Sequence, residues 1–303
     1  MIELAFSVAI CTRDRKLLLR ECLASLAANN FTTQPFEVLV IDNGSSDKTK
    51  EEVDRFSGSF EFIRYISEER LGLSIARNTA ISRAKSPWLV FLDDDAKASP
   101  DFLWRFYDSI SNYDFDGIGG VFYPWYSRGP VAWMPSSVIQ FPLLRADRGP
   151  LKRGSFIAGG ICAFKKEWLE RIGLFSEKIG MRGNVVGYGE ENEIQERIWK
   201  LGGEIWFDPE WKIEHYVAPY KYEIKWHVKR LIGKGRDFQF RIGPLTKLEV
   251  FKLLLKLGFA GAFLGIYNSM KFIFINPYPW QMWFLESFSF SLMAWGRILS
   301  NHK

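Results

Sequence analysis

The sequence predicts an α/β protein built on a mostly parallel sheet with helices on both of its faces. In the first 92 residues, short apolar runs typical of strands alternate with segments of helical periodicity. These runs are mostly apolar, and residues 88–92 are wholly apolar, as expected of a strand that is buried on both faces. Polar residues follow several of them directly, and sheets of this kind bind ligands at the carboxyl ends of their strands.

The expected elements follow one another closely along this first part of the chain. Strands are expected over residues 6–10, 36–41, 60–66 and 88–92. Leu18, Cys22 and Leu26 lie at a spacing of four, which predicts a helix after the first strand. Asp47 is placed to cap the next helix, and residues 74–84 are expected to form a third.

The composition is that of a globular protein, with 47% hydrophobic and 25% charged residues, so the chain can bury a core. Its net charge of +5 fits an anionic substrate or a membrane surface but requires neither, and we expect no nucleic-acid partner. Cys11, Cys22 and Cys162 lack metal-site spacing, which favours a reducing compartment. The N-terminus leads directly into a strand pattern without signal-peptide features, so we expect a cytoplasmic catalytic part.

The strand expected over 88–92 ends in three adjacent acids, Asp93, Asp94 and Asp95. Adjacent carboxylates repel one another and are costly to bury without compensation. Their oxygen atoms suit a hard cation such as Mg²⁺ or Mn²⁺. The alternative is an acidic surface turn before the next helix, for which residues 99–101 form a start signal.

Other polar residues belong to the same pattern. Thr12 and Asp42 follow the first and second strands, so they share the sheet edge of the acidic triplet. The alternative for Asp42 is a turn aspartate that bonds its own backbone. Residues 159–160, a glycine pair, predict a tight turn or a close backbone approach before a strand. Glu190 and Glu191 begin a helix, where acids can simply complement the helix dipole.

Together these segments resemble the inverting glycosyltransferases of family 2, which have a GT-A fold with a Rossmann-like, mostly parallel central sheet. The resemblance covers about residues 7–227, in the family's order of motifs. Its motifs are Ile41-Asp42-Asn43-Gly44-Ser45-Ser46-Asp47, Gly72-Leu73-Ser74-Ile75-Ala76-Arg77-Asn78, Phe91-Leu92-Asp93-Asp94-Asp95, Gly159-Gly160 and Gly189-Glu190-Glu191. It implies a catalytic domain over 1–227, with a nucleotide-sugar half (1–116) and an acceptor half (117–227), and a C-terminal helical region over 228–303.

The resemblance implies transfer of a sugar from a nucleotide-diphosphate donor, with a UDP-sugar expected, to a hydroxyl of a glycan or lipid-linked acceptor. The process would be polysaccharide or glycoconjugate synthesis. A divalent cation, Mn²⁺ or Mg²⁺, would neutralise the charge that builds on the departing diphosphate. Asp95 is expected to coordinate it, Asp93 to share the metal or bind ribose, and Asp94 to assist or remain structural. His215 would complete the metal site or contact the diphosphate, or else be a structural histidine.

The same resemblance assigns nucleotide contacts to Thr12, Arg13 and Asp42, where Asp42 would accept from a uracil imide or from ribose. Arg77 would pair with phosphate or hold the loop of Asp93; the alternative is an exposed helix face.

Inversion requires a base opposite the leaving group. Relatives commonly present Glu-Asp where this chain has Glu190 and Glu191, and the second acid is their base. Glu191 is therefore the expected base, with Glu190 binding acceptor or orienting the helix, although the longer side chain leaves the assignment open. On the acceptor side we place Gly159, Gly160, Trp125 and Trp133; the two tryptophans can equally be partly buried side chains of a surface subdomain.

The C-terminal region is basic and then apolar. Apolar segments over 253–275 and 280–295 are interrupted by Lys256, Lys271 and Glu286, and each uninterrupted piece is shorter than a membrane span. The pattern favours helices that lie in a membrane surface at the inner face of the cell membrane. The alternative is a helical pair packed on the catalytic domain or at a homodimer interface.

Two other functions compete with sugar transfer. A nucleotidyltransferase acting on sugar phosphates would share the sheet and the acids, but it usually has a glycine-rich phosphate loop, which residues 11–15 lack. A catalytically silent glycan-binding or assembly protein on the same scaffold would keep the fold without turnover.

Overall fold

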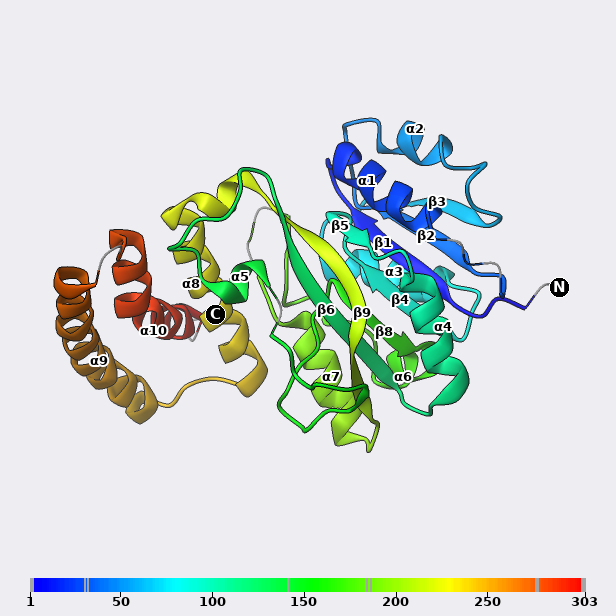
Figure 1. Cartoon of the computed structure of the whole chain (residues 1–303). Helices are drawn as coiled ribbons and strands as arrows, with labels where there is room; N and C mark the ends of the chain where they lie inside the picture. The colour runs from blue at the N-terminus through cyan, green and yellow to red at the C-terminus, as the bar shows by residue number, and fades with distance from the viewer. Residues whose placement is uncertain are drawn as a thin grey trace. The chain divides into compact units, whose positions relative to one another are not determined.

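The computed structural model describes residues 3–29, 31, 33–140, 142–183, 185, 187–275 and 278–300 (Figure 1). It contains two compact units. The first comprises Met1–Trp125, Gln140–Lys178 and Glu190–Tyr216, and the second comprises Tyr126–Ile139, Ile179–Gly189 and Val217–Lys303. The domain boundaries expected from the sequence stay a prediction.

In the described residues, nine strands form one sheet in the order β3-β2-β1-β4-β8-β6-β9-β5, with β7 beside β9. The strands are β1 Ser7–Thr12, β2 Glu37–Asp42, β3 Ile63–Ser67, β4 Trp88–Leu92, β5 Ala96–Ala98, β6 Gly117–Tyr126, β7 Gly149–Pro150, β8 Ile161–Lys165 and β9 Ile205–Val217. The helices are α1 Lys16–Ala27, α2 Thr49–Asp54, α3 Leu73–Arg83, α4 Phe102–Asn112, α5 Ser136–Ile139, α6 Lys166–Arg171, α7 Glu190–Lys200, η1 Pro219–Tyr222, α8 Ile224–Ile242, α9 Lys247–Phe274 and α10 Trp280–Ser300.

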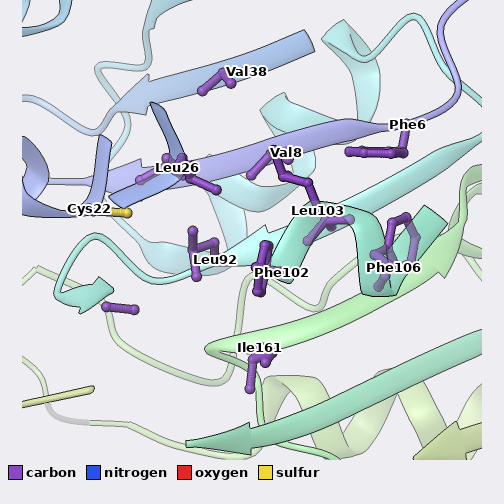
Figure 2. Packing of buried hydrophobic residues seen from close by; sticks show 14 of the residues in the cluster. Phe6, Val8, Cys22, Leu26, Val38, Leu92, Phe102, Leu103, Phe106 and Ile161 are labelled. Atoms are coloured by element: carbon purple, nitrogen blue, oxygen red, sulfur yellow. The ribbon is translucent and has the colours of Figure 1, made fainter. Parts of the chain in front are cut away.

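Strands β1 to β4 are parallel and buried between two helical layers. On one face, Val8 and Ile10 of β1 belong to a core with α1 and α4 (Figure 2). On the other face, Ala9 belongs to a core with α3 and α7. Because both faces are covered, the strands are mostly apolar, and β4 is apolar at every position, which explains its uninterrupted run in the sequence.

The GT-A fold class is confirmed, and the sheet is mixed. Strands β1–β4 pair in parallel, whereas β8 runs antiparallel to β4 and to β6, and β9 runs antiparallel to β5 and β7. These antiparallel partners come from the second half of the sheet, where the sequence predicted turns and aromatic residues more clearly than strands. They bring residues that are far apart in the chain to the end of β4.

The predicted elements are present with shifted ends. Strand β4 has the expected limits, β1 and β2 extend to Thr12 and Asp42, and the third strand is shorter than expected. The capping prediction for Asp47 is wrong: the N-cap residue of α2 is Lys48, with a φ of 64° and no side-chain cap. Asp47 instead accepts hydrogen bonds from the backbone N–H of Lys16 (2.9 Å) and from the Thr49 hydroxyl (2.6 Å).

The second unit contains a helical region in which α10 packs against both α8 and α9 (Figure 1). Helix α9 begins with a capping box between Thr246 and Glu249 and continues through Lys252 and Lys256 for 28 residues. Among the described helices, it alone is long and apolar enough to cross a membrane by length and composition. The lysines that we treated as interruptions therefore lie within one helix.

Close packing of β6 on β9 yields a stability prediction. A Cβ added at Gly120 would overlap the backbone carbonyl oxygen of Trp211, which cannot move aside as a flexible side chain can. We expect Gly120→Ala to lower the free energy of unfolding by about 2 kcal/mol or more, measured by urea denaturation. Gly58→Ala, where nothing lies within 4 Å of the added carbon, is the control and should change stability by less than about 1 kcal/mol. Equal effects of the two substitutions would contradict this account of the packing.

Candidate active site

Two carboxylates and one imidazole meet at the end of β4. The Nε2 atom of His215 lies 3.3 Å from Oδ1 of Asp95 and 3.6 Å from Oδ2 of Asp93. One ligand atom from each of these residues lies within 4.8 Å of the others. The pairing of β5 with β9 sets Ala96 opposite His215, and this places the histidine beside the triplet. Carboxylate oxygens with one imidazole nitrogen suit Mn²⁺, so this set fits the expected cation.

The neighbouring Asp94 turns toward β1. Its carboxylate accepts a hydrogen bond from the Thr12 hydroxyl (2.7 Å) and one from Arg15 (3.0 Å), which also contacts Asp95 at 3.3 Å. Burial and the adjacent charges of Asp95 and Asp93 raise the pKa of Asp94 to about 6, against the opposing effects of Arg15 and Thr12. The structure thus separates Asp94 from the metal-ligating cluster and joins it to Thr12.

The pKa of Asp93 is shifted in the opposite direction from that of Asp94. Burial would raise its pKa, but hydrogen bonding to His215 and the positive charges of Arg77 and Arg15 hold the pKa of Asp93 below its usual value. The carboxylate is therefore ionised at neutral pH, as a metal ligand must be.

The loops after β1, β2 and β3 are held together by short polar side chains. Asp14, with a φ of 52°, accepts hydrogen bonds from the backbone N–H of Ser46 (2.7 Å) and from its hydroxyl (3.0 Å). Asn43 donates to the carbonyl oxygens of Glu68 and Arg70 and accepts from the N–H of Gly72 (2.8 Å). These bonds order the edge of the sheet where a nucleotide is expected.

Asp42 has partners within this edge. Its Oδ1 accepts from the N–H of Ser45 (2.8 Å), which is the turn role left open as the alternative, and its Oδ2 accepts from the Tyr65 hydroxyl (2.6 Å). Burial and the charge of Asp42 raise the pKa of Tyr65 to about 12, so the phenol remains a donor. Each carboxylate oxygen can accept more than one hydrogen bond, so a nucleoside contact remains compatible with this geometry.

Arg77 is buried, with 3% of its surface exposed, so the alternative of an exposed helix face is wrong. It donates to Oε1 of Glu190 (2.9 Å) and to the carbonyl oxygen of Gly159 (3.1 Å), and lies 3.9 Å from Oδ1 of Asp93. The guanidinium also lies over the rings of Phe91 and Phe175. Arg77 therefore connects the metal-ligating cluster with the acid pair.

The acid pair begins α7, and its two members differ. Glu190 is buried; this burial and the charge of Glu191 raise the pKa of Glu190 to about 8, although Arg77 opposes the shift. Glu191 is more exposed, and its side chain lies beside Gly159. Environments that favour a proton on one acid and leave the other more accessible to solvent are typical of acid–base pairs.

The glycine pair allows a close approach of backbone to both acidic groups. A Cβ added at Gly160 would overlap the Asp93 carboxylate, and one at Gly159 would lie 3.1 Å from Arg77 and 3.3 Å from Glu191. Pairing of β8 with β4 positions the turn, since the N–H of Asp93 donates to the Gly160 carbonyl oxygen (3.2 Å). The predicted close approach at this pair is therefore confirmed, and its neighbours are the acids.

The structure also locates the three other predicted site residues, Arg13, Trp125 and Trp133. Arg13 lies on the β1–α1 loop, 3.8 Å from Asp14. In the first unit, Trp125 contacts Tyr216 and the Lys97 ammonium, which is 3.9 Å from its ring centroid. In the second unit, Trp133 packs on a small core of Met134, Val138 and Val217, in a partly buried position.

Two residues of this region escaped the sequence analysis. Arg15 donates to Asp94 and contacts Asp95, and Tyr65 donates to Asp42. Buried acids need a nearby cation, but nothing in the sequence marked Arg15 or Tyr65, because their partners are distant along the chain.

With this geometry described, comparison with known proteins identifies the family. The model of glycosyl transferase family 2 matches residues 7–173, more than half of the chain. The chain belongs to glycosyl transferase family 2. The family and the fold agree with the predicted glycosyltransferase activity.

Individual relatives are more distant. Glycosyltransferase AglE of Haloferax volcanii is 34% identical over 115 residues, which is 38% of this chain and 38% of that protein. The glucosyl-dolichyl phosphate glucuronosyltransferase of the same organism is 24% identical over 76% of this chain and 74% of the relative. The mannosyltransferase PcManGT from Pyrobaculum calidifontis, solved with GDP-Man and Mn²⁺, has a TM-score of 0.67 at 17% identity, covering 98% of this chain and 87% of that one. This likeness shows the shared GT-A fold.

The buried pair of Arg77 and Glu190 yields a prediction about stability. We expect Arg77→Met to lower the free energy of unfolding by about 3 to 5 kcal/mol, because it removes the counter-charge of Asp93 and the hydrogen-bond donor of buried Glu190. Arg70→Met is the control: Arg70 pairs with Glu68 but is 61% exposed, so its loss should cost about 1 kcal/mol or less. In urea denaturation at pH 9, above the pKa of about 8 of Glu190, Glu190→Gln should recover part of the loss when combined with Arg77→Met. Strict additivity of the two substitutions would contradict the pairing.

The raised pKa of Glu190 yields a prediction about pH. Since the folded protein binds this proton more tightly than the unfolded chain, its contribution to stability is complete below about pH 4.5 and is lost as the pH rises to about 8. The free energy of unfolding of Glu190→Gln minus that of the wild type should therefore increase between pH 5 and 8, by at most about 1.4 kcal/mol per pH unit. Glu167→Gln, on the exposed side of α6, controls for the removal of a carboxylate. Parallel pH profiles of Glu190→Gln and wild type would contradict the raised pKa.

Proposed function

We propose that this protein is a metal-dependent, inverting hexosyltransferase. It moves a sugar from a nucleotide-diphosphate donor, with a UDP-sugar expected, to a hydroxyl of a glycan or lipid-linked acceptor in polysaccharide or glycoconjugate synthesis. The observation that carries the proposal is the position of Arg77 between Asp93, at 3.9 Å, and Glu190, at 2.9 Å. The candidate metal cluster and the acid pair that contains the proposed base thus lie on either side of one buried cation.

On the donor side, Asp95, Asp93 and His215 would hold Mn²⁺ or Mg²⁺. When bound, the cation would neutralise negative charge on the leaving nucleoside diphosphate. Thr12, Arg13 and Asp42 are the proposed nucleoside contacts. The Asp42 oxygens can accept from the imide of uracil, and Asp94 supports this side by binding Thr12 and Arg15.

On the acceptor side, Glu191 is the proposed base. It takes the proton of the acceptor hydroxyl while the hydroxyl oxygen bonds to the anomeric carbon, and the bond from that carbon to the diphosphate oxygen breaks on the opposite face. This displacement inverts the anomeric centre. Glu190 retains its proton and, with Arg77, orients the start of α7. Gly159 and Gly160 let the backbone approach Asp93 and Glu191 closely, and they are proposed acceptor-side residues together with Trp125 and Trp133.

A lipid-linked acceptor is supported by a relative of this chain. The relative that aligns with 76% of the chain is named a glucosyl-dolichyl phosphate glucuronosyltransferase. We propose a location at the inner face of the cell membrane; the name of this relative and the apolar character of α9 support contact with a membrane.

The two competing functions have less support than sugar transfer, and one of them can be tested directly. Membership of glycosyl transferase family 2 disfavours a nucleotidyltransferase. A silent binding protein would keep these residues without turnover, so an activity measurement separates the two.

The activity prediction uses UDP- and GDP-sugars, Mn²⁺ and a panel of glycan and lipid-linked acceptors, with released nucleoside diphosphate as the readout. Glu191→Gln should lower kcat by about 100-fold or more and leave donor affinity within about twofold, because the base acts only on the acceptor. Asp95→Ala or removal of the metal with EDTA should abolish metal-dependent donor binding, measured by calorimetry.

The matched control is Glu193→Gln on the same helix, because Glu193 pairs with Arg197 and has no proposed role in the reaction. It should retain most of the activity. Absence of metal-dependent release from every donor, with Asp95→Ala indistinguishable from wild type, would overturn the enzymatic proposal.

A further inference from the structure

Exposed apolar side chains cover much of the surface of α9, and beside the stripe defined below they include Leu254, Phe263, Tyr267, Phe272 and Phe274. We define the apolar stripe as Leu248, Phe251, Leu255, Ile266, Met270 and Ile273, whose exposed fractions range from 49% to 71%. Their spacings of three, four and eleven residues place them on the same side of an α-helix. Leu253 and Asn268, on the other side, are buried. The stripe therefore faces away from α10.

The polar groups near the stripe are satisfied within the helical pair. Asn268 donates to the Ser287 hydroxyl (3.2 Å), and Trp283 donates to Ser269 (3.1 Å). Lys271 pairs with Glu286 at 2.9 Å. The acyl region of a bilayer offers no hydrogen-bonding partners, so a surface that faces lipid must satisfy its polar groups within the protein, as this one does. An interface with another protein usually includes polar contacts between the partners.

The charges near the stripe favour an anionic membrane surface. Lys252 and Lys256 are exposed and flank the stripe, and Lys247 lies at its N-terminal end. Lysines beside an apolar surface can extend toward lipid headgroups while the apolar side chains enter the acyl region.

The packing of α8 on α10 disfavours an orientation in which α9 crosses the bilayer. Its 28 residues are about 42 Å long, which would suffice for a span. However, α10 joins α9 at Ser287 and α8 at Met293, where a Cβ on Gly235 would overlap the Met293 carbonyl oxygen. Helix α8 carries basic residues around this contact: Lys229, Arg230, Lys234, Arg236 and Arg241. A spanning α9 would draw these charges toward the bilayer interior, which is costly.

We propose that the apolar stripe binds the acyl-chain region of a bilayer that contains anionic lipid, with α9 parallel to the membrane plane. The stripe enters the leaflet below the headgroups, and Lys252 and Lys256 contact the headgroups beside it. The chain thus attaches to one membrane surface through α9, and the first unit needs no membrane-embedded part.

The first experiment measures sedimentation of the full chain with vesicles, without substrates, so its result is independent of the transferase proposal. Ile266→Glu and Ile273→Glu should each lower the partition coefficient between vesicles and water roughly tenfold or more. Each substitution replaces an apolar side chain that is proposed to enter the leaflet with a carboxylate. Leu17→Glu on α1 is the matched control, since Leu17 is 62% exposed, close to the 67% of Ile266, and should bind as wild type does. Exchange of Lys252 and Lys256 for glutamate should weaken binding to phosphatidylglycerol-containing vesicles much more than binding to pure phosphatidylcholine.

The second experiment measures how deeply three positions of α9 enter the bilayer. Cysteines introduced at positions 248, 266 and 273 are labelled with a fluorophore and quenched by brominated lipids, with the labelling of wild type as background. Similar depths at the three positions support the parallel orientation. A span would place positions 248 and 273 near opposite interfaces, so a much greater depth at 266 than at both of them would overturn it. Circular dichroism confirms that each variant is folded. Failure of wild type to bind vesicles, together with a dimer that Ile266→Glu dissociates, would overturn the lipid proposal and identify a second copy as the occupant of the stripe.

Discussion

The buried guanidinium of Arg77 is the interaction on which the site depends. Asp93 and Glu190 come from segments almost a hundred residues apart, and without Arg77 the charge of Asp93 would lose a counter-charge and buried Glu190 a hydrogen-bond donor. Arg77 also binds the Gly159 carbonyl oxygen and lies over Phe91 and Phe175. One side chain therefore sets the distance between the donor and acceptor sides and lets both remain in a largely dry edge of the sheet.

A second constraint is the order of the loops that follow the parallel strands. Asp14, Asn43 and Asp47 each bond the backbone of a neighbouring loop, and Asp42 is held between Ser45 and Tyr65. Short side chains that bond backbone remove freedom from the loops before a ligand arrives. Binding then costs less conformational entropy, which is the physical meaning of a preorganised site.

The two units stabilise their polar groups in different ways. In the first, buried carboxylates need counter-charges, and Arg15, Arg77 and His215 provide them. In the second, polar atoms on α9 and α10 bond one another, and the apolar side chains remain outside. The second arrangement is unfavourable in water and favourable beside lipid, which is consistent with a transferase whose acceptor is carried by a membrane.

The sequence by itself determined the parallel half of the sheet, the position of the acids at its edge, and the glycosyltransferase family. It could do so because strand burial leaves an uninterrupted apolar run, and because Asp42 and Asp93–Asp95 follow such runs directly. Only the tertiary structure decided that Arg77 is buried, that Arg15 and Tyr65 belong to the site, and that His215 meets Asp95 through the antiparallel pairing of β9 with β5. Periodicity reports which face of an element is apolar, but long-range pairing depends on contacts between segments that no local pattern encodes. For the same reason, the lysines of α9 looked like interruptions in the sequence, whereas the folded helix leaves them beside its apolar stripe.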